Sequence, residues 1–69
     1  METKIIVRHR RTRAYVSNGE PNQWTQHPIL ARLFATPYHA LHFCVDQDVQ
    51  NADVMFRSAD GQEARFLRC

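Results

Sequence analysis

Alternation of apolar and polar residues marks two pairs of short strands, one toward each end of the chain. Residues 4–10 (KIIVRHR) begin with β-branched residues and then alternate, and residues 13–17 (RAYVS) follow as a second strand. Residues 53–57 (DVMFR) and 63–68 (EARFLR) alternate on either side of the sequence SADGQ, whose Asp-Gly pair is a strong hairpin signal. The pattern therefore predicts two β-hairpins.

The first hairpin has no glycine around Arg11 and Thr12 to supply the positive φ that a tight primed turn needs. A longer or type I turn is therefore expected there. If Val7 and Val16 face the core, the period-2 alternation of a strand decides which residues face outward. The expected outer residues are Ile6, Arg8, Arg10, Arg13 and Tyr15.

The middle of the chain predicts a loop followed by helices. Residues 17–23 (SNGEPNQ) are rich in turn-forming residues. Two prolines stand where the first turn of a helix tolerates them, and Thr36 is a suitable N-cap for the second helix. We expect a short helix near 28–34 and a main helix near 37–47.

The main helix carries an apolar stripe at the spacing of one helix face. The stripe consists of Pro37, Ala40, Leu41, Cys44 and Val45. His39 and His42 project from the opposite side. The chain is therefore predicted to be an α+β domain of ββαββ order, with a small antiparallel sheet and the short and main helices packed on one face. The side chains expected to be mainly buried are Tyr15, Phe34, Leu41, Phe56 and Phe66.

The length of 69 residues indicates a single domain, residues 1–69. Folding at this size buries only roughly 60% of the chain's surface, and such a core contributes about 3–5 kcal/mol of net stability. A homodimer or a larger partner would be a natural source of further stability. With 43% hydrophobic and 23% charged residues, the composition is that of a globular protein.

The sequence shows no apolar run of membrane-spanning length and no signal-peptide core, so a cytoplasmic location is expected. Its two cysteines agree with this expectation. Cys44 is interpreted as a small buried apolar residue and Cys69 as a free thiol. A disulfide between them, or a Cys69-linked dimer, remains an alternative.

Candidate chemistry is sparse. Four histidines invite a metal hypothesis, but Cys44 lies on the other side of the helix from His39 and His42, and a structural zinc site needs four closed ligands. The apolar surroundings of Cys44 raise the pKa of a thiol, and the sequence has neither a nucleophile elbow nor a glycine-rich phosphate loop. We therefore expect no enzymatic activity, no metal and no cofactor.

Charge is the most uneven property of the sequence. Residues 1–13 hold five cationic side chains and one carboxylate, a net charge of +4, whereas the rest of the chain carries −2. Guanidinium groups bind phosphates and carboxylates, and tyrosine and tryptophan are favoured at interfaces and as stacking surfaces. The predicted partner-binding residues are Arg8, Arg10, Arg11, Arg13, Tyr15 and Trp24.

Three interpretations of this arginine-rich hairpin stay open. It could bind an acidic protein surface, it could bind DNA or RNA, or it could be a solvated edge that charge protects against aggregation. The overall charge of +2 is low for a general nucleic-acid-binding protein, so a protein partner is favoured.

A run of residues from Tyr15 onward resembles a pattern found in short phage and prophage proteins. In those proteins a strand hairpin that ends in tyrosine precedes an Ala-x-x-Phe-x-Thr segment and a helix. The residues that carry the resemblance are Tyr15, Trp24, Thr25, Pro28, Ala31, Arg32, Phe34, Thr36 and Ala40. The chain departs from the pattern at the first turn, where glycine is common and Arg13 stands here.

The resemblance implies an origin in a mobile genetic element, and in that case a location in the cytoplasm of a host cell. It also implies a small inhibitor that binds and blocks a host protein complex, in the manner of anti-CRISPR proteins. Both are expectations by analogy, because a shared fold does not determine function.

Overall fold

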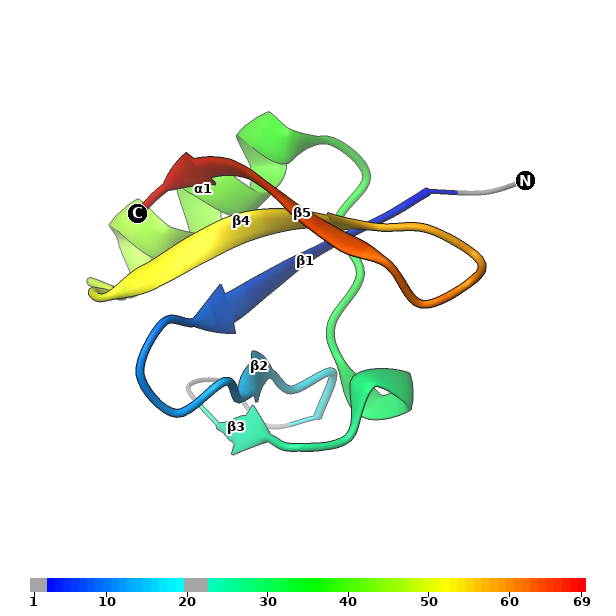
Figure 1. The fold of residues 1–69 in the computed structure, drawn as a ribbon. Coiled ribbons are helices and arrows are strands. Elements are labelled where there is room, and N and C mark those ends of the chain that lie inside the picture. The colour runs from blue at the N-terminus through cyan, green and yellow to red at the C-terminus, as the bar shows by residue number, and fades with distance from the viewer. Residues whose placement is uncertain (1–2, 20–22) are drawn as a thin grey trace.

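The computed structural model describes residues 3–19 and 23–69, which form a five-stranded antiparallel sheet and one α-helix (Figure 1). The predicted α+β class is confirmed, but the order along the chain contains one more strand than expected. The elements are β1 (Lys4–His9), β2 (Tyr15–Val16), β3 (Trp24–Thr25), the 3-10 turn η1 (Pro28–Leu30), α1 (Pro37–Asp46), β4 (Ala52–Arg57) and β5 (Glu63–Arg68).

The strands lie in the order β3-β2-β1-β4-β5. The two predicted hairpins are therefore neighbours in one sheet, joined by antiparallel pairing of β1 with β4 from Lys4 opposite Arg57 to His9 opposite Ala52. The extra strand β3 pairs with β2 over two residues only, which is too short for an alternation pattern to reveal. The rest of the predicted loop from 17 to 23 includes residues outside the described part of the chain.

Each hairpin turn contains a residue with a left-handed backbone conformation, and the residue type differs between the two turns. In the β4–β5 turn Gly61 has φ of +90° and donates its N–H to the Ser58 carbonyl at 3.0 Å. In the β1–β2 turn Arg13 has φ of +63° and donates to the His9 carbonyl at 3.0 Å. The expectation of a longer first turn is confirmed, and the left-handed residue in it is an arginine.

The predicted helix near 28–34 is wrong beyond its first turn. After η1 the backbone becomes extended, because its polar groups bond to the sheet and not to a helix. Arg32 donates its N–H to the Val16 carbonyl at 2.7 Å, and Phe34 donates to the Ile5 carbonyl at 2.9 Å. We call residues 31–36 the linker; through Phe34 it gives β1 a hydrogen-bond donor beyond the end of the short strand β2.

The main helix α1 begins and ends as its sequence predicts. Thr36 accepts a hydrogen bond from the His39 N–H at 3.1 Å, and Pro37 occupies the first turn. At the other end Val49 donates to the Cys44 carbonyl at 2.8 Å and Asp48 has φ of +53°. This is a Schellman cap in which Asp48 occupies the position that glycine usually takes.

The sheet has an apolar layer on each face, whereas the sequence predicted only one. The layer under α1 contains Val7, Val16, Ala40, Cys44, Ala52 and Val54. The opposite layer contains Ile6, Tyr15, Ala31 and Met55. Ile6 was expected on an outer face and does lie on the face away from α1, yet only 1% of its surface is exposed because the linker covers it.

The burial predictions were only partly correct. Tyr15 is buried, whereas Phe34, Leu41 and Phe56 are half-buried. Phe66, expected to be mainly buried, is 44% exposed because it lies on the edge strand β5, where its ring packs edge-on against Phe56. Val45 of the predicted helix stripe is 72% exposed, because the stripe that contacts the sheet is narrower than expected.

Candidate functional site: a basic face of the sheet

The face of the sheet opposite α1 gathers cationic side chains from three strands and the first turn. Residues directly opposite each other in an antiparallel pair point to the same face. The register pairs Lys4 with Arg57 and Arg8 with Asp53, and the same face continues onto β5. We call this surface the basic face; its cationic members are Lys4, Arg8, Arg10, Arg57, Arg65 and Arg68.

A β-bulge in β5 brings two of these arginines together. Arg65 lies opposite Met55 and Arg68 lies opposite Asp53, with a register shift between Val54 and Met55. Residues three apart on a regular strand would point to opposite faces, but one extra residue reverses the phase. Strict alternation in the sequence therefore separates these two arginines, and the bulge places both on the basic face.

Glu63 is the anionic centre of the basic face. Its carboxylate accepts hydrogen bonds from Arg8 at 2.8 Å and from the Tyr15 hydroxyl at 2.7 Å, and it is also paired with Arg57. Its side chain is only 9% exposed. The strand of Glu63 is three positions from the strand of Tyr15, so these bonds require the sheet to curl strongly, as its twist allows (Figure 1).

A second acidic residue holds the start of the first turn. Arg10 donates to the Asp53 carboxylate at 2.9 Å and to the Ala52 carbonyl at 3.0 Å, and Asp53 is 5% exposed. Arg8 and Arg10 therefore already have partners within the molecule. The sequence could not reveal this, because both carboxylates come from the C-terminal hairpin.

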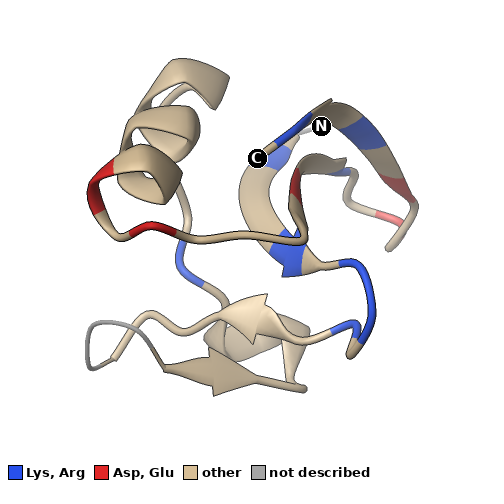
Figure 2. Ribbon diagram, turned by 90° about the vertical axis from the view of Figure 1, so that its left-hand side faces the viewer, with Lys and Arg blue, Asp and Glu red and all other residues tan. Residues whose placement is uncertain are grey.

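Five cations remain exposed on or beside the basic face. Among the described residues none of them makes an ion pair. They are Lys4, Arg11, Arg13, Arg65 and Arg68. Figure 2 shows Lys and Arg on the strands and on the turn after β1, whereas helix α1 contains none and has acidic residues at its C-terminal end. The six cations of the basic face outnumber its two carboxylates, an excess of four positive charges.

The Tyr15 hydroxyl belongs to the interior of this network and is not a free contact. Burial raises the pKa of Tyr15, and the hydrogen bond to Glu63 and the negative charge of that carboxylate raise it further. The side chain is 8% exposed. The predicted role of Tyr15 in partner contact stays untested, but its described contacts are structural.

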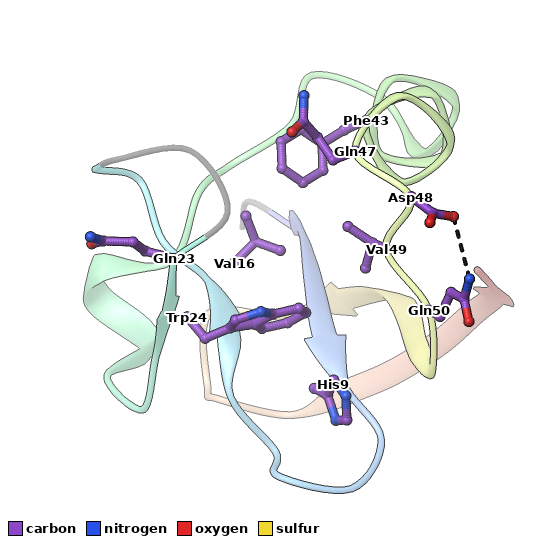
Figure 3. Close-up of a pocket in the computed structure, with 9 residues that line it drawn as sticks. All are labelled: His9, Val16, Gln23, Trp24, Phe43, Gln47, Asp48, Val49 and Gln50. Carbon is purple, nitrogen blue, oxygen red and sulfur yellow. Dashed lines mark hydrogen bonds between the residues drawn. The ribbon is translucent and has the colours of Figure 1, made fainter.

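Trp24 lies on the other face of the sheet, away from the arginines with which it was grouped. It pairs with Val16, and its indole packs edge-on against the His9 ring at a centroid distance of 5.3 Å. Figure 3 shows this indole between Val16 and His9 in a hollow of about 350 Å³ that extends to Phe43 at the end of α1. The predicted site residues are thus divided between two faces.

The cysteines form a contact between α1 and the end of β5. Both are free thiols; Cys44 is buried, as predicted, and Cys69 is half-buried. A hydrogen bond to Cys69, followed by burial, raises the pKa of Cys44. The same hydrogen bond lowers the pKa of Cys69. The described part of the chain contains no group of three or more potential metal ligands.

No helix in the described residues has the length and apolar character to cross a membrane. No protein-family model matches the chain, and no curated protein or solved structure matches it significantly. The comparisons therefore give no support to the predicted phage origin or inhibitory role, and both stay predictions.

Proposed function

We propose that the protein is a non-enzymatic binding module that engages an acidic protein surface through its basic face. The observation that carries this proposal is the register of β1, β4 and β5, which collects five cations on one side of the sheet, where Arg10 of the first turn joins them. Blocking of a host complex, as the resemblance to phage proteins implies, would be one use of such a surface.

The internal ion pairs support a binding role for the exposed cations in particular. Glu63 and Asp53 hold Arg8, Arg57 and Arg10 in fixed positions. The exposed pair Arg65 and Arg68 is left free to meet carboxylates of a partner. Complementary charge of this kind steers association and fixes the orientation of a complex.

A nucleic-acid partner is the alternative, and the position of the aromatic residues argues against its single-stranded form. Proteins that bind single strands stack bases on exposed aromatic rings beside a basic groove. Of the two aromatic residues predicted for this task, Tyr15 is buried and Trp24 lies on the other face. Phosphate contacts to a duplex need no stacking, so duplex DNA or RNA remains the version to test.

The test replaces exposed cations and leaves the internal network intact. A variant in which Arg11, Arg13, Arg65 and Arg68 are changed to Gln should fold normally and lose its partners in a pull-down from lysate. Exposed ion pairs contribute about 0.2–1 kcal/mol each, so four losses should weaken binding by roughly fourfold to several hundred-fold. Arg32→Gln, at an exposed cation of the linker that lies over the Phe34 and Phe43 rings, is a single-charge control outside the basic face.

Nuclease treatment and salt separate the two kinds of partner. A nucleic-acid partner would disappear after nuclease treatment, and its affinity would fall with log salt at a slope near −0.9 for each phosphate contact. A protein partner would survive nuclease and show a shallower salt dependence. If the four-arginine variant keeps every partner of the wild type, the basic face is only a solvated surface and the proposal fails.

A further inference from the structure

One end of the basic face is hollowed between the β4–β5 turn and the linker. The hollow has a volume of about 410 Å³. Ile6 and Ala31 from the second apolar layer contribute to it, and Ser58 of the β4–β5 turn lines one side. Polar and charged side chains therefore line much of the hollow, and the nearly buried residues Ile6 and Ala31 lie at its base.

The side of the hollow formed by η1 and the linker exposes large aliphatic side chains. Ile29 is 91% exposed and Leu33 is 54% exposed, and both line the hollow. Isolated exposed apolar residues are ordinary on protein surfaces, but apolar residues gathered around a concave site mark a place where a partner binds. Within the described residues, Ile29 is almost fully open to solvent and Leu33 is more exposed than buried.

Two cations stand at the same hollow. Lys4 and Arg57 face each other across β1 and β4, and both line it. Lys4 is exposed and makes no ion pair among the described residues, and the Arg57 side chain is 27% exposed beside Glu63. The hollow therefore combines an apolar wall with a cationic wall.

We propose that this hollow, which we name the Lys4–Leu33 hollow, binds a peptide segment of the partner in which a large apolar side chain adjoins a carboxylate. The apolar side chain would contact Ile29 and Leu33, and the carboxylate would meet Lys4 and Arg57. This inference rests on the proposed function and specifies the partner's chemistry. A purely acidic ligand would leave the aliphatic wall in water, and a duplex offers phosphates without an apolar group to fill the recess.

The experiment is an NMR titration of the full chain with two synthetic peptides of equal length and charge. One peptide alternates Glu with Leu, and the other alternates Glu with Ser. Burial of a large apolar side chain should make the Glu–Leu peptide bind roughly tenfold more tightly. Its addition should shift the amide signals of Ile6, Ile29, Ala31, Leu33 and Arg57 in particular.

Matched variants show whether the hollow itself makes the difference. The double variant Ile29→Ser and Leu33→Ser should remove the tenfold preference and keep the weaker binding of the Glu–Ser peptide. Val45→Ser changes an aliphatic side chain of similar exposure, 72%, on helix α1 and should keep the preference. Because all three side chains are exposed, the variants should give the spectrum of a folded chain.

The outcomes distinguish this inference from the proposed function. Equal affinity for both peptides would overturn the inference and leave the basic face as an acidic-ligand site. Binding of neither peptide, together with unchanged partners for the four-arginine variant, would overturn both. Signal shifts at these residues that depend on protein concentration without peptide would mean that a second copy of the chain occupies the hollow, which would also overturn the inference.

Discussion

The two faces of the sheet are built in opposite ways, although they share the same strands. Under α1 the strands present small and branched apolar residues such as Val7 and Val54, which are fully buried against Ala40 and Cys44. On the other face Ile6 and Met55 are buried with equal completeness, but a ring of charged side chains surrounds them. One face is closed by a helix, and the other by a linker and a salt-bridge network.

This difference indicates which face of so small a domain is available for binding a partner. The buried residues under α1 are occupied by packing, so we expect their substitution to change mainly stability. The apolar layer of the basic face is small, and cationic side chains lie around it. Charged groups and some apolar surface are therefore available to a partner. The predictions below test whether the basic face is both a structural layer and a binding surface.

The largest effect is expected at the apolar layer of the basic face. Ile6→Ala should lower the free energy of unfolding by about 3 kcal/mol, because Ile6 is 1% exposed and its loss leaves a cavity. That is a large fraction of the stability of a domain of this size. Urea unfolding followed by circular dichroism measures it, with Ile29→Ala, at a 91% exposed site, as the control that should change stability by less than about 0.5 kcal/mol. Equal small effects for both variants would mean that the second apolar layer adds nothing to the fold.

The next effect separates stability from binding at Glu63. Glu63→Gln removes the charge that Arg8 and Arg57 share, so it should cost about 2 kcal/mol of stability. It also makes the basic face more positive, so affinity for an acidic ligand should rise while stability falls. Asp46→Asn makes the same change in net charge at the end of α1, and it should change neither the free energy of unfolding nor the affinity for an acidic ligand by much. Parallel losses of stability and affinity in Glu63→Gln would show that the network, and not the charge, controls binding.

A smaller effect is expected at the Tyr15 hydroxyl. Tyr15→Phe removes its hydrogen bond to Glu63 and should cost about 1.5 kcal/mol near neutral pH. The pKa of Tyr15 is raised in the folded protein, so the unfolded chain loses this proton first, at a pKa of about 10. The stabilisation is therefore present below about pH 10 and is lost as the pH rises through the folded-state pKa. Unfolding measured across this range should show a shallower alkaline loss for Tyr15→Phe, whereas Tyr38→Phe, at a 67% exposed site, should keep the wild-type slope.

Local signals in the sequence were sufficient for much of the fold. The Asp-Gly pair predicts the β4–β5 hairpin, and Thr36 with Pro37 predicts the start of α1, because turns and caps depend on neighbouring residues. The extended linker could not be predicted in the same way. Its backbone bonds go to Ile5 and Val16, which are distant in sequence.

The candidate site was predictable only in part for the same reason. The arginines of the first hairpin stand out in the sequence, and alternation correctly placed Arg8 on the face of Tyr15. The contribution of Arg65 and Arg68 depends on a bulge, and the pairing of Arg8 depends on the curl that brings Glu63 across the sheet. The curl has no local signature in the sequence. The bulge has a weak one, because the adjacent apolar residues Phe66 and Leu67 interrupt strict alternation at the position of the bulge.

The smallest effect is expected at Arg13 of the first turn, whose backbone conformation is unfavourable and whose charge we expect to contribute to binding. Arg13 has φ of +63°, a conformation that costs little for glycine and more for any other residue. Arg13→Gly should therefore stabilise the domain by about 0.5–1 kcal/mol, while the loss of an exposed cation beside the basic face weakens binding of an acidic ligand. Asp48→Gly relieves a similar φ of +53° at the end of α1, and it should stabilise the fold without weakening binding. Denaturant midpoints and peptide affinities measured on both variants decide the matter: if Arg13→Gly gains stability and keeps full affinity, the arginine of the turn has no part in binding.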